Sequence, residues 1–160
     1  MEFVEVTKLR TVDCMEIFLR NFSHVPDEKL HWAPCPSAKS SLRIAAHTAL
    51  YAARFAEMIR QRSMPMPDNL EAWLAARNNE EMAIQSREEV EQAFRAGTAE
   101  VLAALDTLSP EEVESVLDSG QGWSISMRWL MGLPAWHATL HTGQIDYLQT
   151  CWDDQEIYVG

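Results

Sequence analysis

Four stretches of the chain place apolar side chains three and four residues apart, which is the spacing that forms one buried face of an α-helix. They cover residues 7–22, 41–62, 86–105 and 127–152. Only 6 Gly and 7 Pro occur among the 160 residues, so few positions interrupt these helices. With no convincing β-hairpin pattern and no internal repeat, the sequence predicts an all-α, antiparallel four-helix bundle in a single domain over residues 1–160.

The connection between the second and third helices is predicted to be long and partly helical. The segment after residue 62 contains prolines and is followed by a short helical pattern at residues 70–77. The third helix begins at Ser86, in a Ser-x-x-Glu pattern that is typical of a capping box. In the fourth helix, Gly132 and Pro134 are expected to kink or split the helix before it reaches its histidines.

The charge of the chain limits its partners. It has 24 acidic and 13 basic residues, which gives a formal net charge of -11 at pH 7. Such a surface repels phosphate groups, so we expect no binding to nucleic acid or to an anionic membrane. The N-terminal segment does not resemble a signal peptide, and no stretch is apolar enough to span a bilayer. Three scattered cysteines form no recognisable disulfide or metal motif, so the reducing cytoplasm is the expected compartment.

Three of the five histidines fall on helix faces that are expected to point inward. His137 and His141 lie four residues apart in the fourth helix, so both imidazoles project from one face. His47 lies within an apolar stripe of the second helix. A single histidine in such a stripe is more often a hydrogen-bonded core residue, but three are better explained as ligands of one metal ion. His24 and His31 lie in the connection after the first helix and are interpreted as surface residues.

Three segments of the sequence match the pattern of a known family. The first is Asp-Glu-Lys-Leu-His-Trp-Ala-Pro at residues 27–34, and Ser-Leu-Arg-Ile-Ala-Ala-His follows at residues 41–47. The third is His-Ala-Thr-Leu-His-Thr-Gly-Gln-Ile-Asp-Tyr-Leu-Gln at residues 137–149. Together with the order of the helices, these segments resemble the DinB-like (DinB/YfiT-like) superfamily of four-helix bundles. The resemblance covers nearly the whole chain.

The resemblance places the three metal ligands of the family on His47, His137 and His141. It implies zinc, nickel or iron as the ion and a homodimer as the assembly, and it does not imply DNA binding. The family more often has a basic residue after its last ligand, where this chain has Thr142. That difference leaves the coordination intact and bears on surface contacts or substrate preference.

Three neutral imidazoles leave at least one coordination position open, which is the arrangement of catalytic rather than structural zinc sites. The resemblance implies a thiol S-transferase, in which the ion activates a low-molecular-weight thiol toward a small-molecule substrate. The alternatives are a metal-dependent hydrolase that uses metal-bound water and a non-catalytic, metal-binding stress-response protein. Of the two enzymatic interpretations, hydrolysis is the less favoured. It usually needs a general base such as a carboxylate, and none lies on the helix faces that bear the histidines.

Other residues near the predicted ligands have simpler interpretations. Tyr51 and Gln144 lie one helical turn from a ligand and are weak candidates for a catalytic role. Tyr51 is more simply a core aromatic residue, while Gln144 fits equally a partner of a ligand or a residue of helix packing. The acidic pair at residues 80–81 is interpreted as solvated helix surface, and Trp136 as a residue of core or dimer packing.

Overall fold

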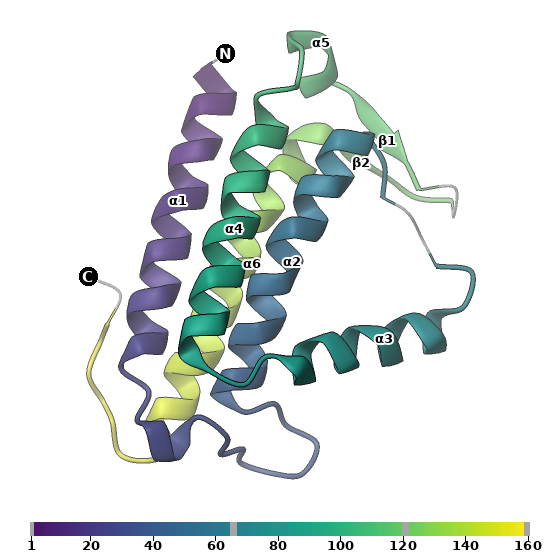
Figure 1. Ribbon diagram of the computed structural model, residues 1–160. Helices are drawn as coiled ribbons and strands as arrows, with labels where there is room; N and C mark the ends of the chain where they lie inside the picture. The colour runs from purple at the N-terminus through teal and green to yellow at the C-terminus, as the bar shows by residue number, and fades with distance from the viewer. Residues whose placement is uncertain (1, 65–66, 120–121, 159–160) are drawn as a thin grey trace.

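Four long helices form the body of the molecule (Figure 1). The computed structural model describes residues 2–64, 67–119 and 122–158. The bundle helices are α1 (Glu2–Ser23), α2 (Ser41–Gln61), α4 (Arg87–Leu105) and α6 (Met127–Thr150). The shorter elements are the 3-10 turn η1 (Asp27–Lys29), α3 (Leu70–Ala83), α5 (Pro110–Val113), and the strands β1 (Val116–Asp118) and β2 (Ser124–Ser126). The predicted four-helix bundle and the partly helical connection are confirmed, with α3 longer than predicted.

A short antiparallel pair of strands precedes α6, although the sequence showed no convincing hairpin. Val116 pairs with Ser126, and Leu117 pairs with Ile125. Within β1 only Leu117 is buried. Strands of three residues are too short to show the apolar alternation by which a hairpin is recognised.

Each bundle helix runs parallel to one neighbour and antiparallel to the other. Gly97 of α4 lies against Ala52 of α2, and Arg60 of α2 donates a hydrogen bond to Glu100 of α4, so these helices run in the same direction. α1 and α6 are the other parallel neighbours. Two parallel helices that follow each other in the chain, such as α2 and α4, must be joined by a segment that runs back along the bundle. This segment must span the length of a helix, which is about 28 Å for the 19 residues of α4. α3 lies in that return segment, which explains the long connection (Figure 1).

α2 and α4 approach each other closely because small residues lie between them. A Cβ atom added at Gly97 would lie 2.8 Å from Cβ of Ala52 and 2.9 Å from the backbone nitrogen of Ala53. These distances are shorter than van der Waals contact, and a backbone atom cannot move aside unless the helices separate. Gly97 therefore sets the spacing between α4 and the helix that bears His47.

Replacing Gly97 with alanine is expected to destabilise the protein, although alanine favours helices. Overpacking costs about 1–3 kcal/mol, which exceeds the roughly 1 kcal/mol gained in helix propensity. Gly132→Ala is the matched control, since a Cβ atom there meets nothing within 4 Å. That variant should gain stability. Urea unfolding measures both, and a Gly97→Ala protein as stable as Gly132→Ala would contradict the close packing.

The predicted start of the third bundle helix is confirmed. The hydroxyl of Ser86 accepts a hydrogen bond from the backbone N–H of Glu89, and the carboxylate of Glu89 accepts one from the backbone N–H of Ser86. Ser40 caps α2 in a similar way, by accepting from the backbone N–H of Arg43. These caps fix where the helices begin and so which of their residues face the core.

Gly132 and Pro134 were expected to kink or split this helix, and α6 is continuous across both residues, so it is not split. Pro134 removes one backbone hydrogen bond, at a cost of about 3 kcal/mol. Leu130 and Met131 are fully buried beside it, and each such burial is worth about 1.5–3 kcal/mol. Packing therefore outweighs the local preference, and both histidines of α6 lie in one helical register. Neither α6 nor any other described helix has the length and hydropathy of a membrane-spanning segment.

Candidate metal centre

Three imidazole rings from two helices meet inside the bundle. α2 supplies His47, and α6 supplies His137 and His141. The Nε2 atom of His137 lies 3.3 Å from that of His47 and 3.0 Å from that of His141. Metal–nitrogen bonds of about 2.0–2.1 Å in a tetrahedral site separate the ligating nitrogens by about 3.3 Å, so the two separations at His137 match those of ligands that share one ion. All three ligand nitrogens lie within 4.8 Å of one another. His24 and His31 are exposed, as expected, and lie outside this cluster.

In two of the three rings, the nitrogen that faces away from the common point, Nδ1, lies within hydrogen-bond distance of a side-chain oxygen. Nδ1 of His47 lies 2.6 Å from Oε1 of Glu81, and Nδ1 of His141 lies 2.7 Å from Oε1 of Gln144. A carboxylate or amide oxygen only accepts hydrogen bonds, so each Nδ1 carries the proton and each Nε2 directs a lone pair to the common point. Metal-ligating histidines usually donate their other N–H to an oxygen in this way. The hydrogen bonds therefore prepare the two rings for a cation.

The surroundings of His137 and His141 disfavour protonation of their rings. Burial, with smaller contributions from the neighbouring His141 and His47, lowers the pKa of His137 to about 3. Burial also lowers the pKa of His141, against the opposing effect of its hydrogen bond with Gln144. His137 and His141 are therefore neutral at pH 7, which is the form that binds metal.

The sequence matches the model of the DinB superfamily over residues 12–145. The chain belongs to the DinB superfamily. This confirms the resemblance that was found from the segments around the histidines. No curated protein matches the chain significantly.

Two solved structures from Bacillus subtilis share the DinB fold of this chain. The DinB-like protein YjoA has 13% sequence identity and a TM-score of 0.66, with 98% of this chain and 95% of that chain covered. YfiT is described as a probable metal-dependent hydrolase with an unusual four-helix bundle topology. It has 16% identity and a TM-score of 0.64, with 95% of this chain and 86% of that chain covered. At these identities the comparison establishes the fold.

The interpretation of Glu81 as a solvated surface residue is wrong. It is 4% exposed, and its second carboxylate oxygen, Oε2, accepts a hydrogen bond from Nζ of Lys39. Burial raises the pKa of Glu81, but hydrogen bonds from His47 and Lys39 outweigh burial and hold the pKa below its usual value. The carboxylate is therefore ionised. One indication of a buried polar partner was present in the sequence, because His47 lies in an apolar stripe and a histidine there needs a hydrogen-bond partner.

Polar contacts hold the C-terminal end of α3 on α2. The guanidinium group of Arg43 donates hydrogen bonds to the backbone oxygens of Glu81 and Ile84. These oxygens lie at a helix end, where carbonyl groups lack partners within the helix. Glu80 forms an ion pair with Arg54 of α2. The last turn of α3 is thus fixed beside the helix that supplies His47.

Tyr51 packs directly on the centre of this DinB bundle. Its ring centroid lies 4.4 Å from that of His47 and 5.2 Å from that of His137, and the guanidinium carbon of Arg54 lies 4.6 Å from it. Burial raises the pKa of the Tyr51 hydroxyl, so it stays protonated near neutral pH. The structure places Tyr51 and Gln144 in contact with the histidines, as their helical spacing indicated. A catalytic role for either residue stays a prediction.

An open pocket of about 750 Å³ lies beside His47 and His141. Lys39 and Gln144 contribute polar groups to it. Most of the wall is apolar and consists of Pro34, Ala38, Ile44, Leu140, Tyr147 and Leu148. None of the described residues that line the pocket is acidic, although the whole chain has a net charge of -11. The pocket therefore suits a small, largely apolar molecule and does not repel an anionic group.

Proposed function

We propose that this DinB chain is a metal-dependent enzyme whose ion is bound by His47, His137 and His141. The convergence of three Nε2 atoms supports this most directly, because the separations of 3.0 and 3.3 Å are those of imidazole nitrogens that share one ion. Imidazole ligands suit zinc, nickel and iron, and each is a candidate ion. Elemental analysis of protein purified without added metal tests the proposal. About one equivalent of one ion is expected, and metal-free protein that takes up none on reconstitution would oppose it.

Within this class we infer transfer of a low-molecular-weight thiol to a small electrophile. The thiol gives up its proton to solvent, its sulfur forms a new bond to carbon, and the leaving group departs with its electron pair. When bound, the ion lowers the pKa of a thiol or of water in its open coordination position, so that either becomes a nucleophile near neutral pH. The apolar wall of the pocket would bind the carbon skeleton of the electrophile. All three cysteines are unpaired, and we propose the thiol-rich cytoplasm as the compartment.

Hydrolysis is the second candidate, because YfiT is described as a probable metal-dependent hydrolase. Metal-dependent hydrolysis usually needs a general base close to the ion. No carboxylate occurs among the described residues of the pocket wall. Glu81 contacts His47 at Nδ1, on the side of the ring away from the point where the Nε2 atoms meet. We therefore place thiol transfer before hydrolysis.

A comparison of two assays separates these activities. Metal-loaded protein is incubated with a panel of low-molecular-weight thiols and 1-chloro-2,4-dinitrobenzene, and in parallel with nitrophenyl esters in the absence of thiol. We expect thiol-dependent formation of the coloured thioether by the metal-loaded protein and not by the metal-free protein. Ester cleavage without thiol would favour the hydrolase. Neither activity, with metal bound and stability raised, would favour a metal-binding stress-response protein.

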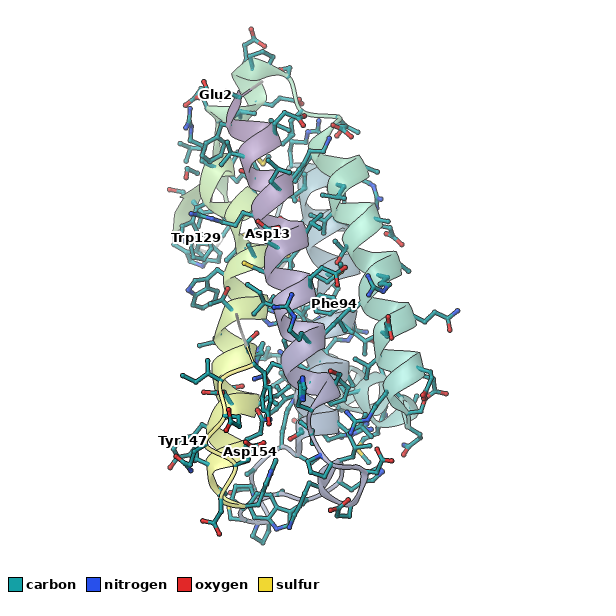
Figure 2. The ribbon with its side chains drawn as sticks, turned by 90° about the vertical axis from the view of Figure 1, so that its left-hand side faces the viewer. Glu2, Asp13, Phe94, Trp129, Tyr147 and Asp154 are labelled. Carbon is teal, nitrogen blue, oxygen red and sulfur yellow. The ribbon has the colours of Figure 1, made fainter. Side chains whose placement is uncertain are left out.

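We also propose that the chain forms a homodimer through the outer face of α6, beside α1 (Figure 2). Trp129, Trp136, Leu140 and Tyr147 are large apolar side chains that are exposed along α6. They follow one another at intervals of seven, four and seven residues, the spacing of a seam that packs against another helix. A twofold axis across the seam pairs it with itself in a second copy. Leu140 and Tyr147 also line the pocket beside the histidines, so the pocket would lie at the edge of this interface. Trp136 would thus be a residue of dimer packing.

Trp136→Glu is expected to convert the dimer into a monomer. The substitution places a charge in the middle of the seam, where association would strip it of water. Size-exclusion chromatography with light scattering gives the mass of each species. Leu74→Glu is the control, because Leu74 is an exposed apolar residue on α3, away from the seam. Dissociation by both variants, or a wild-type monomer at high concentration, would contradict the assigned interface.

A further inference from the structure

We propose that Glu81 is a positioning residue of the metal centre, and that through it the crossover helix α3 becomes part of that centre. The inference rests on the proposed metal binding by His47. The carboxylate would keep the proton of His47 on Nδ1, so that Nε2 stays unprotonated and aimed at the ion. A neutral imidazole without such an acceptor exchanges its proton between its two nitrogens, and only one of the two forms can bind metal through Nε2.

The contact between Glu81 and His47 is direct and enclosed. Oε1 of Glu81 lies 2.6 Å from Nδ1 of His47, and Oε2 accepts a hydrogen bond from Lys39. Both carboxylate oxygens of Glu81 thus accept hydrogen bonds, and the residue is only 4% exposed. Glu81 and Lys39 together are neutral, so the pair orients the ring without adding net charge near the ion.

Helix packing alone does not explain why an acid is buried here. Among the 14 residues of α3, all of which the structure describes, only Glu81 is buried. A carboxylate loses its hydration on burial, and this is unfavourable unless charged and hydrogen-bonding partners replace the water. An apolar side chain would join α3 to the bundle without that penalty. The buried acid is therefore better explained by the histidine that it holds.

Arg43 fixes the position of Glu81 along α2. Its guanidinium group donates hydrogen bonds to the backbone oxygens of Glu81 and Ile84, at the end of α3. Arg43 and His47 are four residues apart, so they lie on one face of α2 and the last turn of α3 contacts both. Docking of α3 and metal binding by His47 are thereby linked, and each favours the other by the same free energy.

Two substitutions at Glu81 test its role through the affinity for zinc, measured by competition with a chromophoric chelator. The dissociation constant is expected to rise about 10-fold for Glu81→Gln and up to about 100-fold for Glu81→Met, whose side chain has no oxygen acceptor. Glu80→Gln is the matched control on the same turn of α3. Glu80 pairs with Arg54 and Arg77 and contacts no histidine, so Glu80→Gln weakens only the docking of α3, and it should lower the affinity for zinc by less than Glu81→Gln does.

Nitrogen-15 NMR of the metal-free protein gives a second readout, which a purely structural role would not change. His47 is expected in the Nδ1–H form in the wild type and as a mixture of both forms in Glu81→Met. A wild-type His47 protonated at Nε2 overturns the inference even if a variant fails to fold. Equal losses of zinc affinity in Glu81→Met and Glu80→Gln, or no loss in Glu81→Met, overturn it as well. Because the NMR result needs no metal, a wild type that binds no ion defeats the proposed function separately.

Discussion

Replacing His137 with alanine is expected to abolish metal binding and to lower the proposed thiol-transfer activity by about 10³-fold or more. Its Nε2 atom lies within hydrogen-bond distance of the Nε2 atoms of both His47 and His141, so it is the central ring of the three. Catalytic zinc sites use three protein ligands. Two remaining histidines hold an ion weakly, and the nucleophile loses the cation that stabilises its charge.

The matched control for this variant is His31→Ala. His31 is exposed and lies outside the histidine cluster, so its loss should leave metal content and activity unchanged. Plasma mass spectrometry gives the metal content, and the thiol-transfer and ester assays give the activity. Circular dichroism checks that both variants are folded. A folded His137→Ala protein that retains one tightly bound equivalent of metal would show that the three histidines do not form the site.

Removal of the metal is expected to lower the unfolding temperature by about 8–16 °C. An ion that binds only the folded state, present at 1,000 times its dissociation constant, contributes about 4 kcal/mol to the free energy of unfolding. In a chain of 160 residues, each kcal/mol shifts the midpoint by about 2–4 °C. The effect is global because the ion joins α2 to α6. Thermal unfolding before and after treatment with a chelator, and again after zinc is restored, measures the shift.

The His137→Ala protein serves as the control for this experiment as well. Its unfolding temperature should respond neither to the chelator nor to added zinc, because the ion has lost its central ligand. The wild type should recover its original midpoint when zinc is restored. An unchanged midpoint in wild-type protein from which the ion has verifiably been removed would contradict preferential binding to the folded bundle.

Local rules predicted the helices and the meeting of the histidines. Apolar periodicity located the four bundle helices, and the Ser86 pattern located the start of α4. His47 lies in an inward stripe of α2, and the spacing of His137 and His141 puts both on one face of α6. The helices of a bundle share a single interior, so inward-facing histidines on two of them come together. The convergence of the three rings could therefore be predicted without coordinates.

The features that sequence reasoning missed depend on contacts between distant segments. Nothing within α2 or α4 specifies that these neighbours run parallel. The end of α3 is polar, and a polar pattern does not distinguish Glu81, which is buried against α2, from an acid in solvent. Pro134 disfavours a helix locally, but the burial of the residues around it decides the outcome. In each case tertiary packing overrides the local preference.

The order of the ligands along the chain determines when the ion can first be captured. His47 and His137 are 90 residues apart, and α6 follows all the other bundle helices. A ribosome adds residues from the N-terminus, so α1, α2 and α4 are complete before α6 emerges. Until then the nascent chain offers a single imidazole from this centre, that of His47, and the other two follow together on α6. During synthesis, all three proposed ligands are therefore available together only after α6 has emerged.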